Sequence, residues 1–174
     1  MNYPVLYSFK RCPYAMRARM ALKLADIKCE LREVRLNNKP NHMLEVSPKG
    51  TVPVLILKDT VIDESMEIIN WVLSKVDLFK NNISQYQIDL SEELITTFDN
   101  KFKYHLDRYK YLTRYEDADL EFHQNKCLNI LCDFEKTISD GDWIFGDKLN
   151  KLDISILPFI RQYKICLLYT SDAA

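Results

Sequence analysis

Apolar and polar positions follow two different periods in the first 76 residues of the chain. Apolar runs predict strands at residues 5–9, 28–36, 51–57 and 61–62. The second of these strands carries many charges, which suits the edge of a sheet. Apolar positions at helical spacing predict helices near 13–25, 37–46 and 65–76. The expected order is therefore β-α-β-α-β-β-α, which is an α/β arrangement.

The rest of the chain shows only helical periodicity. Long helices are predicted at about 90–115 and 120–138, and a third from residue 150 onward, where Asn150 and Asp153 form a variant of the capping box. Residues 77–87 have little apolar periodicity and are interpreted as a connection. We therefore expect two domains, 1–76 and 88–174, joined by a linker at 77–87.

Composition narrows the class of protein. The 174 residues are 47% hydrophobic, which supports a globular chain, and 24 basic against 25 acidic residues leave a net charge of −1. This balance predicts no broad attraction to nucleic acid or to an anionic membrane. The five cysteines form no C-x-x-C pair, which argues against a disulfide scaffold and a zinc site, so we expect no metal. Without a signal peptide or an apolar run of ~20 residues, a cytoplasmic protein is predicted.

One cysteine stands where the first strand gives way to the first helix. Pro13 suits the first helical position because its missing N–H is not needed there, so Cys12 is predicted at or beside the N-cap. A helix N-terminus favours a thiolate, and Lys10 or Arg11 would assist. The apolar stripe of this helix leaves Arg17 on another face. The alternative interpretation is that Cys12 is a small buried thiol.

Four short segments, in this order and spacing, carry a resemblance to a known family. They are Arg11-Cys12-Pro13-Tyr14, Lys49-Gly50-Thr51-Val52-Pro53-Val54, Asp63-Glu64-Ser65, and Gly146-Asp147 with the cap from Asn150 to Asp153. Together they resemble the cytosolic glutathione S-transferase family, most closely its cysteine-type, omega-like and glutaredoxin-like branch. The resemblance implies a thioredoxin-like N-terminal domain with a four-stranded mixed sheet, an all-α C-terminal domain, glutathione as co-substrate, and a homodimer.

Part of the glutathione site would lie around the proline that begins the third strand. If the bond before Pro53 is cis, as in the family, Val52 presents its backbone N–H and C=O to the cysteinyl part of glutathione. The alternative is a trans proline at a strand start. The resemblance also implies that Lys39 reaches the glycyl carboxylate and that Tyr14 belongs to the glutathione site.

The start of the third helix offers groups for the other end of glutathione. The hydroxyl and N–H of Ser65 can receive the γ-glutamyl carboxylate, while Glu64 can take the ammonium group. This pairing would distinguish glutathione from ordinary peptides. The alternative interpretation makes Ser65 only an N-cap and Glu64 a solvated charge.

Ala15 stands where a dithiol redox protein would have its second cysteine. The predicted chemistry is therefore monothiol transfer, in which Cys12 forms a mixed disulfide with glutathione and reduces glutathione mixed disulfides or dehydroascorbate-type substrates. Two alternatives stay open. One is conjugation of glutathione to electrophiles, for which Tyr7 or Ser8 could supply a hydroxyl, and the other is a non-catalytic binding or regulatory module.

The predicted helix at about 90–115 is rich in aromatic and basic residues. Tyr104, Arg108 and Tyr111 share a face and are candidates for a second-substrate pocket, which would hold a small electrophilic or disulfide substrate. Phe98 and Phe102 lie four residues apart and are interpreted as helical core. Acidic residues interrupt the basic cluster, which argues against nucleic-acid binding.

The end of the chain departs from the family pattern. Family members continue through several more helices after the segment Ile160-Arg161-Gln162-Tyr163, whereas residues 166–174 show no recognisable continuation. We therefore expect a truncated C-terminal domain, with a doubtful tail from about residue 166 and an unsettled oligomeric state.

Overall fold

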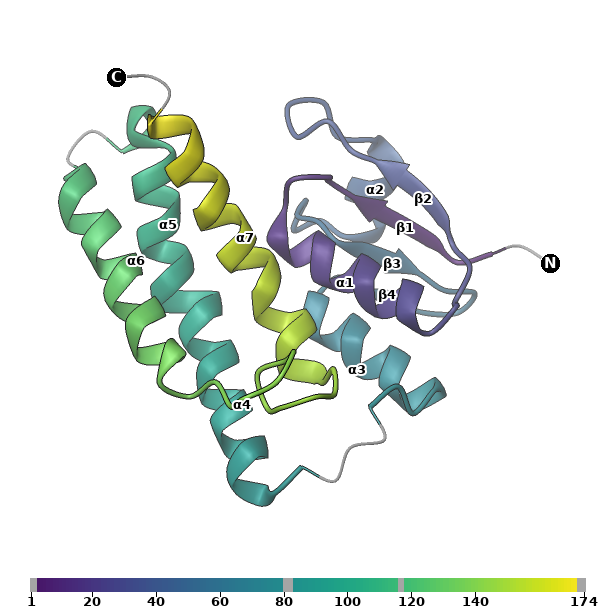
Figure 1. The fold of residues 1–174 in the computed structure, drawn as a ribbon. Helices are drawn as coiled ribbons and strands as arrows, with labels where there is room; N and C mark the ends of the chain where they lie inside the picture. The colour runs from purple at the N-terminus through teal and green to yellow at the C-terminus, as the bar shows by residue number, and fades with distance from the viewer. Residues whose placement is uncertain (1–2, 80–82, 116–117, 172–174) are drawn as a thin grey trace. The chain divides into compact units, whose positions relative to one another are not determined.

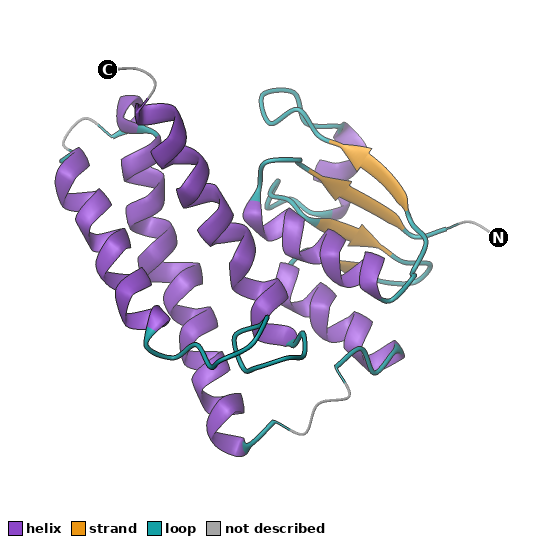
Figure 2. Ribbon diagram, viewed as in Figure 1, coloured by secondary structure: helices purple, strands orange, loops and turns teal. Residues whose placement is uncertain are grey.

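The computed structural model describes residues 3–79, 83–115 and 118–171 (Figure 1). The chain divides into two compact units, Met1–Leu78 and Phe79–Ala174, and each is described by itself below. The first unit is mixed α/β and the second is helical (Figure 2). Among the described residues, no helix has both the length and the apolar character needed to cross a bilayer.

The first unit has the predicted order of elements. They are β1 (Val5–Ser8), α1 (Pro13–Leu24), β2 (Glu30–Glu33), α2 (Asn41–Val46), β3 (Val54–Ile56), β4 (Val61–Ile62) and α3 (Ser65–Lys75). The sheet order is β2-β1-β3-β4, in which β1 pairs parallel with β2 and antiparallel with β3. The charged strand β2 lies at the edge, as its composition predicts. This four-stranded mixed sheet with helices is the thioredoxin-like fold that the sequence predicts.

Small residues on α1 let this helix approach its neighbours closely. Ala15, Ala18 and Ala21 are completely buried, and α1 packs along α3, whose apolar stripe Ile68, Ile69 and Val72 is also completely buried. Figure 1 shows α1 and α3 on one face of the sheet and α2 on the other. Burial of these apolar side chains contributes favourable free energy to the folding of the unit. The packing also holds the N-terminus of α1, where Cys12 lies, against the sheet.

The second unit consists of helical segments. They are α4 (Gln85–Thr97), a π-helical segment η1 (Phe98–Phe102), α5 (Lys103–Lys110), a 3₁₀ turn η2 (Leu112–Arg114), α6 (Leu120–Glu135) and α7 (Lys151–Ser171). The first helix thus begins at Gln85 instead of about residue 90. Its start is a capping box, in which Ser84 Oγ accepts from Gln87 N–H at 3.2 Å and Gln87 Oε1 accepts from Ser84 N–H at 2.9 Å.

An aromatic cluster forms the core of the second unit. The ring centroid of Phe98 lies 4.7 Å from that of Phe102 and 5.6 Å from that of Phe134, while Phe159 and Tyr163 of α7 pack against the first two. Phe98 and Phe102 are completely buried, which confirms their interpretation as helical core. The π-helical segment carries both rings, so this irregular turn belongs to the packing of the core.

The N-terminus of α7 is held by the predicted capping box. Asn150 Oδ1 accepts from Leu152 N–H at 2.8 Å, and Asp153 Oδ2 accepts from Asn150 N–H at 2.7 Å. Asp153 Oδ1 also accepts from Ile144 N–H at 3.0 Å, which ties the preceding turn to the helix. Burial raises the pKa of the Asp153 carboxyl, and its three backbone donors act against that rise.

Candidate functional site

Cys12 is the N-cap residue of α1, the position that the sequence predicts. Its backbone is extended (φ −77°, ψ 121°), and Pro13 occupies the first turn of the helix. The side chain is partly exposed. Its Sγ–H donates to the carbonyl oxygen of Val52 at 3.7 Å. The thiol therefore lies between the N-terminus of α1 and the segment that leads into β3, where solvent can reach it.

The loop that carries Cys12 is tied down from α1. The guanidinium of Arg19 donates to Ser8 Oγ, to the Phe9 carbonyl at 3.2 Å and to the Lys10 carbonyl at 3.1 Å. The Cys12 N–H donates to the Phe9 carbonyl at 3.0 Å. The loop is thus ordered by one side chain that reaches back over it. The sequence analysis did not single out Arg19 for this role.

Of the two basic residues before Cys12, Arg11 has its guanidinium 5.9 Å from the centroid of the Phe9 ring. The backbone N–H of Lys10 donates to Glu33 Oε1 at 2.7 Å. Assistance of the thiolate by Lys10 or Arg11 stays a prediction. Cys12 lies at the N-terminus of α1, where the helix dipole favours a negatively charged thiolate.

The segment before β3 presents backbone groups next to Cys12. The Val52–Pro53 peptide bond is cis, as the family resemblance implies. Within the described part of the chain, no acceptor is found for the Val52 N–H. Nearby, Gly50 has a φ of +63°, and a β-carbon added there would lie 3.5 Å from Lys39 Nζ. The Lys39 ammonium therefore lies over the turn that precedes Val52.

Ser65 is the first residue of α3, and Glu64 is its N-cap. This corrects the alternative in which Ser65 would itself be the N-cap. The Ser65 hydroxyl is buried and accepts from Arg17 Nε at 2.9 Å, while the Arg17 guanidinium lies 5.1 Å from the centroid of the Tyr14 ring. Arg17 thus joins Tyr14 to Ser65. Of these three residues, Arg17 is the one that the sequence analysis placed on a different face from the apolar stripe of α1.

Arg17 is 2% exposed, so the face of α1 that carries it, which the sequence analysis set apart from the apolar stripe, is buried at this position as well. The side chain extends from α1 to the start of α3, so the packing of the two helices determines its burial. The sequence does carry a signal for this burial. Arg17 stands between positions of an alanine-rich helix that were expected to be buried. A buried guanidinium needs hydrogen-bond partners, and here one of them is a predicted site residue.

Glu64 belongs to a small charged network. Lys49 Nζ lies 2.5 Å from Glu64 Oε1 and 3.3 Å from Asp63 Oδ1, and Ser47 Oγ donates to Asp63 Oδ2 at 2.7 Å. The Ser47 hydroxyl and the Lys49 ammonium hold the pKa of Asp63 below its usual value. The sequence analysis quoted Lys49 in a motif but assigned it no role. The lysine determines the position of the Glu64 carboxylate in this structure.

The hydroxyls of β1 have structural partners. Tyr7 is 2% exposed, and its hydroxyl lies 3.0 Å from His42 Nδ1 and accepts from an Arg32 nitrogen at 3.1 Å. Ser8 is completely buried and accepts from Arg19. These contacts favour the interpretation of both residues as core, whereas the Cys12 thiol is partly exposed.

The other cysteines differ in their surroundings. Burial raises the pKa of the Cys127 thiol to about 12 and raises those of Cys29 and Cys166. Cys132 is exposed on α6. Among the described residues, no group of three or more potential metal-binding side chains comes together.

The predicted second-substrate residues do not form one cluster. The Arg108 guanidinium lies 3.5 Å from the centroid of the Tyr104 ring and 4.4 Å from that of Tyr115. Tyr104 also packs against His123 of α6, with a centroid separation of 6.0 Å. Tyr111 instead contacts Arg114, 4.2 Å from its ring centroid. Their role toward a second substrate stays a prediction.

Comparison with known proteins agrees with this fold. Residues 6–78 match the family model described as "Glutathione S-transferase, N-terminal domain". The probable glutathione S-transferase MSR-1 of Nicotiana plumbaginifolia is 27% identical over 180 residues, covering 99% of this chain and 80% of the relative. Glutathione S-transferase omega-1 of Mus musculus is 44% identical over 50 residues, which is 29% of this chain and 21% of the relative. Glutathione S-transferase DHAR3, chloroplastic, of Arabidopsis thaliana is 23% identical over 157 residues, or 90% of this chain and 56% of the relative.

Solved structures are similar to this chain in fold. Glutathione transferase Omega 3C from Trametes versicolor has a TM-score of 0.79 and 18% identity, covering 96% of this chain and 76% of its own. A glutathione transferase family member from Pseudomonas fluorescens pf-5, solved with two glutathione bound, has a TM-score of 0.79 and 19% identity, covering 99% and 83%. The fold therefore defines a class of protein. Members of this class have a thioredoxin-like unit with a cysteine at its first helix, and a helical unit follows it. The first unit thus matches the glutathione S-transferase N-terminal domain, and the chain as a whole is similar to glutathione S-transferases in sequence and fold.

Proposed function

We propose that this protein is a glutathione-dependent thiol transferase that acts through a mixed disulfide between Cys12 and glutathione. The observation that carries the proposal is the partly exposed Cys12 thiol at the N-terminus of α1, 3.7 Å from the Val52 carbonyl, with completely buried Ala15 one turn later. A single accessible thiol at this position favours exchange with an external thiol. The relatives named omega-1 and DHAR3 support the same branch.

Glutathione would bind along the segment next to the thiol. The N–H and C=O of Val52 can pair with its cysteinyl backbone, as an added strand pairs with a sheet edge. The Lys39 ammonium would receive the glycyl carboxylate. The first N–H groups of α3 and the Ser65 hydroxyl would receive the γ-glutamyl carboxylate. Tyr14 would pack beside this pocket through its contact with Arg17.

Glu64 would bind the ammonium group of the γ-glutamyl end. In the structure its carboxylate is paired with Lys49, but both side chains are largely exposed, and such ion pairs contribute only about 0–1 kcal/mol. A ligand ammonium can therefore replace Lys49 at little cost. Under this proposal, Lys49 pairs with Glu64 only while no glutathione is bound.

The reaction proceeds in two balanced exchanges. The Cys12 thiolate attacks the glutathionyl sulfur of a mixed disulfide GS–SR, the S–S bond of the substrate breaks, and RS⁻ leaves and takes a proton from water. The thiolate of a second glutathione then attacks the glutathionyl sulfur bound to Cys12. Oxidised glutathione leaves and the Cys12 thiolate is restored. The net reaction converts GS–SR and GSH into RSH and GSSG.

Intact-mass spectrometry after treatment with oxidised glutathione tests the mechanism. Wild type and Cys132→Ser, in which the exposed cysteine of α6 is removed, should each gain one glutathionyl group at Cys12 that reduced glutathione removes. Cys12→Ser should lack this adduct and lose turnover of glutathionylated substrate. Folded wild type without an adduct on Cys12 would overturn the proposal. Turnover that survives in Cys12→Ser would instead favour conjugation, and glutathione binding without any turnover would favour a binding module.

A further inference from the structure

A groove lies in the first unit, and its lining residues are not part of the proposed thiol site. It has a volume of about 480 Å³ and lies between α1 and the edge strand β2. Leu6 and Leu22 form its buried wall, Ile27 closes one end, and Leu31 on β2 is 54% exposed beside it. This volume falls within the range of about 300–1,000 Å³ that is typical of small-molecule sites.

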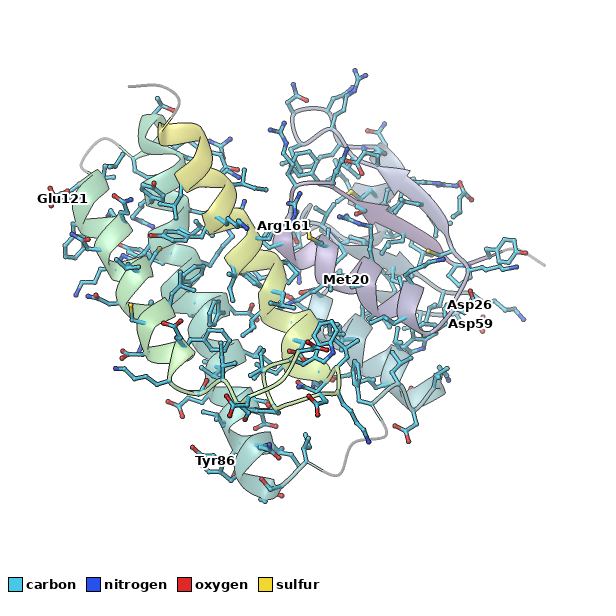
Figure 3. The ribbon with its side chains drawn as sticks, viewed as in Figure 1. Met20, Asp26, Asp59, Tyr86, Glu121 and Arg161 are labelled. Carbon is cyan, nitrogen blue, oxygen red and sulfur yellow. The ribbon has the colours of Figure 1, made fainter. Side chains whose placement is uncertain are left out.

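The polar lining of this groove is mostly cationic. Arg19, Lys23 and Lys28 contribute positive charge, and Asp26 is the one acid among the lining residues. Figure 3 labels Asp26 at the end of α1. Arg19 is engaged with the β1–α1 loop, whereas no ion pair of Lys23 or Lys28 is found among the residues that the structure describes. Among the described residues, neither lysine is therefore held in an ion pair.

The end of α1 presents few competing acceptors to this groove. The carbonyls of Ala21, Leu22 and Lys23 accept from the N–H groups of Ala25, Ile27 and Asp26, at 3.0 to 3.1 Å. Helix C-termini otherwise repel anions through unpaired carbonyls. Because these carbonyls are paired, the lysine ammonium groups dominate the polar side of the groove.

We propose that this groove binds a small amphiphilic carboxylate. The apolar body of the ligand would lie against Leu22, Ile27 and Leu31, and its carboxylate would lie between Lys23 and Lys28. The apolar wall favours burial of hydrocarbon, and the two ammonium groups select an anionic head over a neutral or cationic one. The site is independent of Cys12 and of the proposed thiol transfer.

Fluorescence titration of the full chain with 11-(dansylamino)undecanoate and its methyl ester tests the proposal. Leu31→Glu places a carboxylate beside the apolar wall at an exposed position, and Lys23→Glu/Lys28→Glu reverses the cationic side. The matched control is Lys58→Glu/Lys75→Glu, which makes the same charge change at exposed positions outside the lining. Thermal melts establish that each variant is folded.

We expect saturable binding of the carboxylate to wild type and to the control. Leu31→Glu and the Lys23/Lys28 double variant should each bind about ten-fold more weakly, and the methyl ester should bind wild type about ten-fold more weakly than the acid, since each change removes about 1.4 kcal/mol of binding free energy. The bound carboxylate should also slow alkylation of Cys29, a lining residue, when followed by peptide mass spectrometry.

Four outcomes would overturn the proposal. They are the absence of saturable binding to wild type, equal affinity for the acid and the ester, undiminished affinity in both groove variants, and Cys29 alkylation that the ligand does not slow. A dimer in sedimentation that Leu31→Glu dissociates, together with no ligand binding, would assign the groove to a second copy of the chain. That result would also overturn the proposal.

Discussion

Arg17 Nε donates a 2.9 Å hydrogen bond to Ser65 Oγ, and the two residues are 48 positions apart in the sequence. A hydroxyl that accepts from a guanidinium directs its own proton to another acceptor. At the start of α3, beside the first N–H groups of the helix, the natural acceptor is a carboxylate. Under the proposed function, Arg17 therefore prepares Ser65 to donate to the γ-glutamyl carboxylate.

Replacement of Arg17 by methionine should weaken glutathione binding. The Ser65 hydroxyl loses the donor that orients it, and we expect the Kd to rise about ten-fold, which corresponds to about 1.4 kcal/mol. Calorimetric titration of reduced glutathione measures this change. Ser65→Ala should produce a similar loss, and the double variant should be little worse than either single one because the two residues act as a pair. Lys75→Met, at an exposed position outside the proposed glutathione site, is the matched control, and additive effects of Arg17 and Ser65 would refute the pairing.

Replacement of Lys39 by methionine should discriminate between two forms of glutathione. If the ammonium near Gly50 binds the glycyl carboxylate, the variant should bind glutathione several-fold more weakly, because it loses a charge-assisted hydrogen bond. It should bind the glycyl ethyl ester of glutathione as wild type does. Lys58→Met, at an exposed position, serves as the control in the same titrations. Equal losses for acid and ester would show that Lys39 has no role at that carboxylate.

The stability of the protein should fall with acidity through a pair of histidines. His105 Nδ1 and His123 Nδ1 lie 2.8 Å apart between α5 and α6. Burial lowers the pKa of both imidazoles, and Arg108 and Lys126 lower that of His105 further, while Asp119 opposes the shift at His123. Because the folded pKa lies below the unfolded one, this stability is present above about pH 6.5 and is lost as the pH falls through the folded value.

Urea unfolding at pH 7.5 and pH 5.0 measures the histidine contribution. The free energy of unfolding of wild type should decrease between these values by more than that of His105→Phe/His123→Leu. The difference between the two proteins cancels other titrating groups, including Asp153, whose raised pKa acts with the opposite sign. A wild type and a variant with the same pH dependence would show that the pair does not control acid stability.

Replacement of Asp153 by alanine should destabilise the second unit. The buried carboxylate accepts from the N–H groups of Ile144 and Asn150, and its loss leaves both donors without this partner. We expect a loss of about 2–4 kcal/mol in the free energy of unfolding, seen as a lower urea midpoint. Asp142→Ala, on the exposed turn before Trp143, should change stability by less than about 0.5 kcal/mol. A similar midpoint for the two variants would contradict the role of the capping box.

Local patterns were sufficient for the order of the elements in the first unit and for two helix starts. Pro13 after an apolar run placed Cys12 at the start of a helix, and Asn150 with Asp153 formed the expected cap, because both depend on residues within one turn. The capping box of Ser84 and Gln87 is equally local and was missed, because weak apolar periodicity before residue 90 was interpreted as a connection. This error moved the predicted helix start by five residues.

The order of the strands and helices, the resemblance to a known family and the placement of Cys12 at a helix N-terminus could all be predicted from the amino-acid sequence. Periodicity and capping are properties of neighbouring residues, and they are readable before the chain folds. The burial of Arg17 against Ser65, the pairing of Lys49 with Glu64 and the contact of His105 with His123 could be found only in the folded structure. Each of these pairs joins residues separated by 15 to 48 positions, and their distances follow from how the elements pack.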